Sequence, residues 1–196
     1  MAKPKLALIP AAQGDKFYSV LPSDGVGDFT FTRASTGTRI APTGLIEEVP
    51  SGDSRLDYDL LNGKVVNCPH YLLEPARTNL ITYSEDFSQS YWTKGGASVV
   101  SDAAISPSGL QNADLIIEDT SNGLHLMYCS LSQVLNRADT ISVYVKNVNS
   151  KYIQLTSNNT TTLGLKIIFD LELGVVDSEL FGTGSIESVG NGWYRL

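Results

Sequence analysis

The sequence predicts an all-β protein, and three observations support that prediction. Charged residues make up only 18% of the chain, while 17 glycines and 8 prolines supply many turns. Apolar and polar side chains alternate with a period of two over several segments, as they do on strands with one buried face. No stretch of residues 1–80 keeps a helical period beyond about two turns. These features favour short antiparallel strands joined by tight turns.

Residues 1–80 predict a turn-rich N-terminal β module. Phe29–Thr32 alternates apolar and polar residues, which is typical of a half-buried strand. Leu45–Val49 is a second segment of strand length. The pair Asn62-Gly63 stands between two strand-like runs and therefore predicts a hairpin turn.

Residues 81–196 alternate more regularly and predict an antiparallel, jelly-roll-like β-sandwich. Ile141, Val143 and Val145 alternate with polar or outward positions. A longer apolar series forms one face of a later strand: Leu163, Leu165, Ile167, Phe169 and Leu171. Turn signals separate these segments at the spacing of a sandwich, with each strand placing one face on the core.

Two short segments and the C-terminus need separate interpretation. Ser84–Phe87 predicts a single helical turn, with Ser84 as its N-cap and acidic residues close to the positive end of the helix dipole. Residues 132–139 fit either a loop or one helical turn. Residues 192–196 resemble the beginning of a strand, so we expect the sandwich to be incomplete at its C-terminus.

Composition limits the partners of the chain. The net charge is −7 and no basic cluster interrupts it, which predicts no binding to nucleic acid. No apolar run approaches the roughly 20 residues that a bilayer requires, so we expect no membrane insertion. Cys68 and Cys129 are too far apart in sequence for a metal or redox motif, and two isolated, buried thiols are favoured over one disulfide.

No pattern of residues predicts catalysis. Asp57 and Asp59 share one face of a predicted strand and could hold a hard cation, but a solvated strand edge is the preferred interpretation. His70 and His125 have no neighbouring ligand set. Nucleophile-elbow, phosphate-loop and dinucleotide-binding motifs do not occur in the sequence. We therefore predict no enzyme activity, no catalytic residue, no metal and no cofactor.

Outward tyrosines are the candidate ligand-binding residues. Tyr144 and Tyr152 occupy the outward phase of alternating strands, where a ring can stack on a sugar. In the two tandem aromatic pairs we expect Trp92 and Trp193 to enter the core, which leaves Tyr91 facing outward. These three tyrosines form the predicted glycan-binding set, and ordinary strand surface is the alternative interpretation.

A succession of sequence blocks resembles a known family. Phe29–Thr36, Gly44–Glu47 and Arg55–Tyr58 stand in order, followed by Cys68-Pro69 and then the block Leu72–Leu80. This succession is similar to an N-terminal module of bacteriophage virion fibre proteins, including head and tail fibres of crAss-like and related phages. Of these blocks the last is the most specific, and we expect its apolar side chains to pack the sandwich.

Later blocks resemble the carbohydrate-binding-module-like jelly roll that commonly follows this module. Tyr83–Phe87 and Tyr91–Lys94 are similar to its beginning, and Ser142–Lys146 and Gly190–Arg195 are similar to later strands. The resemblance thus covers nearly the whole chain. It divides the chain into a virion-anchoring and oligomerisation module over residues 1–80 and a sandwich over residues 81–196.

The resemblance implies a role and partners. It indicates a structural fibre of the virion, anchored through its N-terminal region, with a host-glycan-binding adhesin acting by multivalent weak binding as the alternative. The implied partners are further copies in a homotrimer, capsid or tail proteins, and a host surface glycan. The implied location is the virion, assembled in the bacterial cytoplasm and released by lysis. Six residues are the expected assembly contacts: Phe17, Tyr18, Arg33, Arg39, Arg55 and Arg77.

Overall fold

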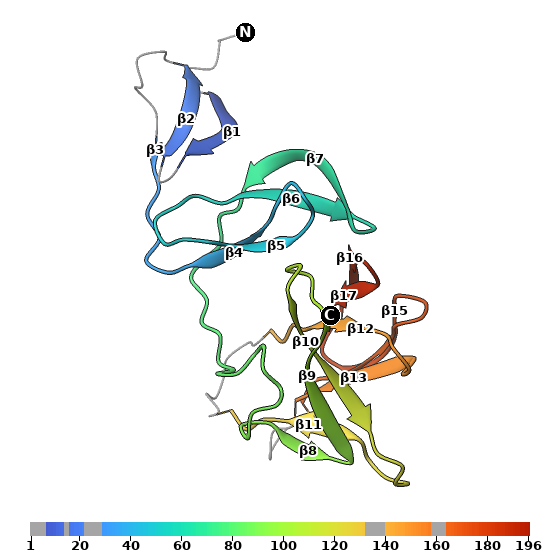
Figure 1. Cartoon of the computed structure of the whole chain (residues 1–196). Coiled ribbons are helices and arrows are strands. Elements are labelled where there is room, and N and C mark those ends of the chain that lie inside the picture. Colours follow the sequence, from blue (N-terminus) through green and yellow to red (C-terminus); the bar gives the residue numbers. More distant parts are fainter. Residues whose placement is uncertain (1–6, 14–15, 22–28, 132–139, 158–163) are drawn as a thin grey trace. The chain divides into compact units, whose positions relative to one another are not determined.

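The structure is a computed structural model that describes residues 7–13, 16–21, 29–131, 140–157 and 164–196, with side chains from residue 31 onward. Strands account for 47% of it, and the described residues form no helix. The strands assemble into several small antiparallel sheets (Figure 1). The all-β, sandwich-like fold class predicted from the sequence is therefore confirmed.

The chain forms two compact units. The first unit combines residues 1–73 with residues 140–196, and the second unit is residues 74–139. The second unit is therefore an insertion in sequence between two halves of the first. The functional division into an anchoring module over 1–80 and a sandwich over 81–196 remains a prediction.

Three small sheets form the N-terminal half of the first unit. Their strands are β1 (Ala7–Gln13), β2 (Lys16–Leu21) and β3 (Phe29–Thr30) in one sheet, β4 (Gly37–Ile40) and β5 (Ile46–Val49) in the next, and β6 (Leu56–Leu61) and β7 (Lys64–Tyr71) in the third. The predicted hairpin turn at Asn62 and Gly63 joins the last pair, with φ angles of 51° and 72°. Positive φ at both residues is the requirement of a type I′ turn and explains the Asn-Gly pair.

Two three-stranded antiparallel sheets form the C-terminal half of the first unit. One has the order β12 (Tyr144–Lys146), β17 (Trp193–Arg195), β16 (Glu187–Gly190), and the other has the order β13 (Tyr152–Thr156), β14 (Lys166–Asp170), β15 (Val175–Phe181). Both sheets contribute side chains to a single apolar cluster. Each sheet therefore has one face on a shared core, which is the arrangement of a sandwich.

Phe169 lies at the centre of this core and is only 1% exposed. Ile167 and Leu171 are buried with it, as period-two alternation through β14 predicts, and Leu196 joins them from the other sheet, where its backbone bonds to that of Val143. Partly buried side chains of both sheets surround this group: Val143, Val145, Ile153, Leu155, Leu165, Val176, Ile186 and Tyr194. The prediction was wrong for Ile141, which is 40% exposed, whereas Val143 packs against the core because its backbone bonds to that of Leu196.

The second unit consists of two separate two-stranded ribbons. Its strands are β8 (Thr93–Gly95) paired with β11 (Leu126–Tyr128), and β9 (Ala97–Ile105) paired with β10 (Gln111–Glu118). Ala113 is the only buried apolar residue among its described residues. The described part of this unit has therefore no apolar core comparable to that of the sandwich. The expectation that the block Leu72–Leu80 packs the sandwich was wrong, because Leu73 and Leu80 are exposed and do not join the core cluster.

The predicted helical turn at Ser84–Phe87 is wrong, because this segment forms bends and turns. The Asp86 carboxylate accepts hydrogen bonds from the backbone N–H and the hydroxyl of Ser88 and from the side chain of Gln89. Such local side-chain bonds compete with helix formation. They also hold the pKa of Asp86 below its ordinary value of 3.8. The other ambiguous segment, residues 132–139, lies outside the described residues.

Candidate functional site

The outer face of β13 carries the best-placed of the predicted tyrosines. Tyr152, Gln154 and Thr156 point away from the core, while Ile153 and Leu155 pack against it. Tyr152 is 50% exposed. The Gln154 amide donates to the Thr156 hydroxyl over 2.6 Å, so both polar side chains are ordered beside the ring. We call Tyr152, Gln154 and Thr156 the Tyr152 face.

A charged cluster flanks the Tyr152 ring at the end of the strand. The Lys151 ammonium lies 5.1 Å from the ring centroid, in the range of a cation–π contact. It also lies 3.2 Å from the Asp170 carboxylate and 3.5 Å from the Glu172 carboxylate. Contact with Asp170, and secondly with Tyr152, raises the pKa of Lys151, which therefore stays protonated. The cation lies over one face of the ring, and the two carboxylates neutralise its charge.

Asp170 is the buried member of this cluster. Its carboxylate accepts from the backbone N–H groups of Glu172 and Leu173, each at 2.9 Å, and so closes the turn between β14 and β15. Burial raises the pKa of this carboxyl, but the N–H of Leu173, the Lys151 ammonium and the N–H of Glu172 together lower it below 3.8. The sequence placed Asp170 on the polar face of the strand. It can be buried because its carboxylate, rather than water, accepts hydrogen bonds from the backbone N–H groups of the turn.

Tyr144 belongs to the other sheet. It stands opposite Arg195, which in turn stands opposite Glu187, in one row across β12, β17 and β16. Burial raises the pKa of Tyr144 above 10.0, and Arg195 offsets part of that rise. Since both sheets turn their other faces to the shared core, Tyr144 and Tyr152 lie on opposite outer faces. The structure does not bring these two predicted glycan contacts together.

Tyr91 lies in the second unit within a group of aromatic rings. Its centroid is 5.7 Å from that of Tyr83 and 5.5 Å from that of Trp92, which it meets edge-on. A hydrogen bond with the Cys129 thiol raises the pKa of Tyr91 above 10.0. The sequence predicted that Tyr91 faces outward and that Trp92 enters the core. Both side chains are half-buried, so both predictions were wrong. Trp193, by contrast, is buried as predicted.

The loop that carries these rings is held by a lysine. The Lys94 ammonium donates to the backbone carbonyls of Ser88, Gln89 and Trp92 at 3.2, 3.2 and 3.3 Å. The indole N–H of Trp92 donates to the carbonyl of Tyr83 over 2.8 Å. These contacts order the aromatic group although little apolar surface is buried around it.

Arg33 and Arg55 bind carbonyls within the chain. Arg33 donates to the carbonyls of Val49, Pro50 and Asp53 at 3.1, 2.6 and 3.1 Å, and Arg55 donates to that of Thr38 at 3.0 Å. These bonds tie β4 and the turn after β5 together. Both arginines thus bond to carbonyls within one chain. A role between chains remains a prediction.

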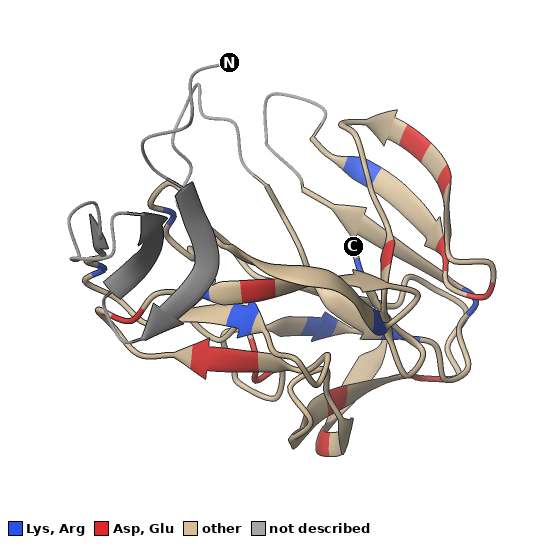
Figure 2. Ribbon diagram, turned by 90° about the horizontal axis from the view of Figure 1, so that it is seen from above, with Lys and Arg blue, Asp and Glu red and all other residues tan. Residues whose placement is uncertain are grey.

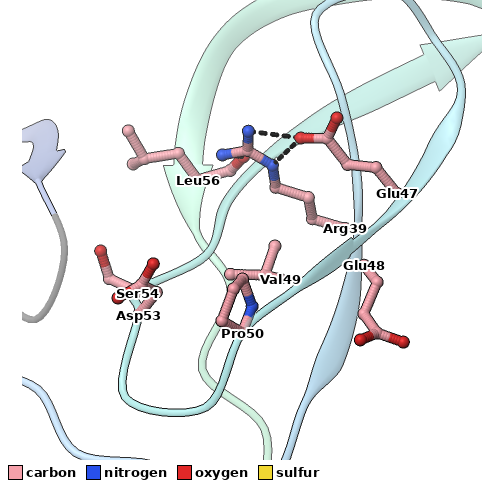
Figure 3. Close-up of a pocket in the computed structure, with 8 residues that line it drawn as sticks. All are labelled: Arg39, Glu47, Glu48, Val49, Pro50, Asp53, Ser54 and Leu56. Atoms are coloured by element: carbon pink, nitrogen blue, oxygen red, sulfur yellow. Dashed lines mark hydrogen bonds and ion pairs between the residues drawn. The ribbon is translucent and has the colours of Figure 1, made fainter.

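Arg39 lies in a small open pocket of about 230 Å³ (Figure 3). Its guanidinium forms an ion pair with Glu47, with Nε 2.6 Å from the carboxylate. Eight residues line the pocket: Arg39, Glu47, Glu48, Val49, Pro50, Asp53, Ser54 and Leu56. Because its single cation is already paired, this pocket offers no free charge for an anionic ligand.

The remaining predicted contacts are dispersed. Arg77 is exposed and its guanidinium donates to the neighbouring Ala76 carbonyl at 3.2 Å. Phe17 and Tyr18 lie on β2, and their side chains are outside the described part of the chain. Figure 2 shows basic and acidic residues interspersed along the strands. Cys68 and Cys129 are both free thiols, as favoured from the sequence, but neither is buried as predicted, since Cys68 is exposed and Cys129 is half-buried.

Among the described residues, no group of three or more side chains is arranged to hold a metal ion. No described helix is long and apolar enough to span a membrane. Each histidine instead lies near two carboxylates through different ring nitrogens: His70 near Asp57 at 3.8 Å and Asp59 at 3.9 Å, and His125 near Glu118 and Asp119 at 3.5 Å.

Comparison with known proteins gives no relative. No family model, no curated protein and no solved structure matches this chain. The site is therefore defined by its own geometry. Sequence reasoning missed Lys151 and Asp170, although an Asp four residues before the glycine of a turn, here Gly174, is a recognisable turn signal.

Proposed function

We propose that this chain is a structural component of a bacteriophage virion, a head or tail fibre that is anchored through its N-terminal region and displays its β-sandwich outward. The observation that carries the proposal is the succession of small sheets with free edges and exposed apolar side chains. Such edges are normally protected by neighbouring chains in an assembly. The resemblance of the sequence blocks to phage fibre modules supports the same role.

The proposal includes a homotrimer, attachment to capsid or tail proteins, and location on the virion after assembly in the host cytoplasm and release by lysis. It includes no catalytic step and no cofactor. The N-terminal anchor is expected to work by strand addition to a virion protein at β1, an edge strand of its sheet. Phe17 and Tyr18 lie on β2, the central strand of that sheet.

Electron microscopy of purified particles labelled with an antibody against the sandwich tests this proposal. We expect label at a fixed site on the head or tail, and no label on particles whose chain lacks residues 1–20. The matched control is a chain with Leu173→Ser, an exposed substitution far in sequence from the anchor. Particles that carry the truncated chain at normal copy number would contradict anchoring by this segment.

A second candidate function, host-glycan binding, is favoured by the Tyr152 face. It combines an exposed ring, an amide and a hydroxyl on one rigid strand, which are the groups that a sugar ring and its hydroxyls require. A single such face gives weak binding, which many copies on a virion would amplify.

Retention of the intact assembly on immobilised host glycan separates this function from a purely structural one. Tyr152→Ala is expected to lower retention at least tenfold, whereas Tyr144→Ala, on the opposite outer face, serves as the matched control. Equal retention of the two variants would reject the Tyr152 face as the binding site. Absence of any retention by the unmodified chain would reject glycan binding altogether.

A further inference from the structure

The chain contains three Asn-Gly pairs, and they lie in two different structural settings. The pairs are Asn62-Gly63, Asn122-Gly123 and Asn191-Gly192. In such a pair the backbone nitrogen of the glycine can attack the side-chain carbonyl carbon of the asparagine, because glycine has no Cβ to hinder the approach. Whether the reaction takes place in a folded protein depends on how freely the main chain of the pair rotates.

Two of the pairs form tight hairpin turns. Asn62-Gly63 joins β6 to β7, and Asn191-Gly192 joins β16 to β17. The residues on either side of each pair stand opposite each other across the two strands. All four turn residues have positive φ angles, from 51° to 79°. This is the geometry of a type I′ turn, which the paired strands hold in place.

The glycines of these two turns are also closely packed. A Cβ placed on Gly63 would lie 2.1 Å from the Cα of Gly190, and a Cβ placed on Gly192 would lie 3.3 Å from the Lys146 side chain. For the attack, the glycine nitrogen must swing toward the asparagine side chain by rotation about the asparagine Cα–C bond. In a tight hairpin this rotation disrupts the pairing of the strands, so the reaction requires local opening of the turn.

The third pair lies in the loop between β10 and β11 (Figure 1). Asn122 and Gly123 are exposed, form bends and have no positive φ. A Cβ placed on Gly123 would meet nothing within 4 Å. Neither residue makes a hydrogen bond to the part of the chain that the structure describes. The main chain of this pair can therefore rotate without disrupting a strand pair.

Contacts on both sides show where the unbonded part of this loop begins and ends. The backbone N–H of Asp119 donates to the carbonyl of Gly96 over 2.9 Å, and the Asp119 carboxylate accepts from the N–H of Ser121, also over 2.9 Å. The His125 ring contacts the Ser121 carbonyl at 3.1 Å. The bonded part of the loop thus stops at Ser121 and resumes at His125, and the Asn-Gly pair lies between them.

We propose that Asn122 is a site of spontaneous deamidation in this chain. The Gly123 nitrogen forms a bond to Cγ of Asn122, its proton passes to the side-chain amide, and the amide nitrogen leaves as ammonia. One water molecule then opens the resulting succinimide ring. Opening at one carbonyl gives aspartate, and opening at the other gives isoaspartate, in which the main chain runs through the former side chain. The reaction consumes one water, releases one ammonia and oxidises no group.

Deamidation changes both the charge and the length of the loop. It adds one negative charge to a chain whose net charge is already −7, next to the carboxylates of Glu118 and Asp119 at the start of the loop. Isoaspartate also inserts one carbon into the main chain between Ser121 and His125, and so weakens the contact that joins them. This inference is independent of the proposed fibre role.

Peptide mapping by mass spectrometry, during incubation of the full chain in mildly alkaline buffer, measures conversion at all three pairs. The rate in the folded chain is divided by the rate of the same pair in urea, which removes the effect of neighbouring residues. We expect this ratio to be at least tenfold higher at Asn122 than at Asn62 or Asn191, since a turn opening that costs about 1.4 kcal/mol slows the hairpin pairs by that factor. Equal ratios at the three pairs would overturn the proposal.

A substitution of the attacking residue tests the chemical route. Gly123→Ala fits the open space and the φ of this position, so we expect an unchanged urea midpoint. The added Cβ hinders the attack and is expected to slow conversion of Asn122 on the order of tenfold. The matched control is Leu124→Ala, at the next exposed residue, which leaves the attacking nitrogen unchanged. Equal conversion of Asn122 in the two variants would overturn the proposal.

The identity of the product is a second test of the route. Fragmentation that cleaves the main chain distinguishes isoaspartate from aspartate at position 122, and we expect both products. Aspartate alone would mean that water hydrolyses the amide directly, which would overturn the succinimide route. Neither result bears on the fibre role, which particle labelling decides.

Discussion

The sandwich of residues 140–196 and the inserted unit of residues 74–139 are built from similar short strands, but they differ in how much apolar surface they bury. In the sandwich, two sheets share a core around Phe169. In the inserted unit, only Ala113 is fully buried among the described residues, and order comes from polar contacts such as those of Lys94. Strand formation alone therefore does not produce a core.

The difference lies in how apolar residues follow the period of the strand. On β14, Ile167 and Phe169 alternate with side chains of the other face, so a single face collects apolar surface. On β10, Ile116 and Ile117 are consecutive and place apolar surface on both faces. A two-stranded ribbon cannot cover both. The apolar surface of this ribbon therefore stays exposed.

The largest expected effect is on the sandwich core. Phe169→Ala should lower the free energy of unfolding by about 3–5 kcal/mol, because it removes a buried ring and leaves a cavity. Urea denaturation followed by circular dichroism measures this change. Leu173→Ala, at an exposed leucine, is the control and should change it by less than about 0.5 kcal/mol. A loss below about 1 kcal/mol for Phe169→Ala would mean that the shared core is not as described.

The stability of the inserted unit should depend most on its polar contacts. Lys94→Met keeps the length of the side chain but removes three hydrogen bonds from a charged donor, which should destabilise this unit by about 1.5–3 kcal/mol. In a Trp193→Phe background, the fluorescence of Trp92 reports on this unit alone. Lys64→Met, at an exposed lysine on β7, is the control. Equal unfolding midpoints for the two variants would contradict the role of Lys94.

A pH titration tests how much Asp170, which closes the turn between β14 and β15, contributes to the stability of the sandwich. The folded pKa of Asp170 lies below its ordinary value of 3.8, so its contribution to stability is present above that pH and is lost as the pH falls through the folded pKa. The urea midpoint of the unmodified chain should therefore fall more steeply below pH 3.8 than that of Asp170→Asn. The control is Asp177→Asn, an exposed carboxylate on β15. Parallel pH profiles for the chain and Asp170→Asn would contradict the assignment.

The smallest expected effect concerns the aromatic group of the inserted unit. Because contact with Cys129 raises the pKa of Tyr91, Cys129→Ala should bring that pKa back toward 10.0. Ultraviolet titration of the tyrosines, with Tyr91→Phe to identify the signal, measures the shift. Cys68→Ala removes the other free thiol and should leave the Tyr91 titration unchanged.

Several parts of the fold and site were predictable from local sequence. The Asn62-Gly63 turn is encoded by two residues that tolerate positive φ, and the apolar face of Ile167 and Phe169 follows from period-two alternation. The outward position of Tyr152 follows from the same alternation on β13. Each depends on neighbours within a few residues.

Other features required the partners of each strand to be known. A period of two assigns a side chain to one of two faces, but it does not say which sheet the strand joins. For that reason the sequence grouped Tyr144 with Tyr152, and the structure separates them onto opposite outer faces. The burial of Asp170 likewise depends on Lys151, which a ladder between β13 and β14 brings beside it.

By itself, the sequence determined that this is an all-β chain of short strands with an apolar face near its C-terminus, because turn residues and alternation act locally. Only the tertiary structure decided that residues 74–139 are inserted as a unit without a core and that Leu73 and Leu80 remain exposed. The physical reason is that burial depends on surfaces supplied by segments distant in sequence, which the local pattern of residues does not contain.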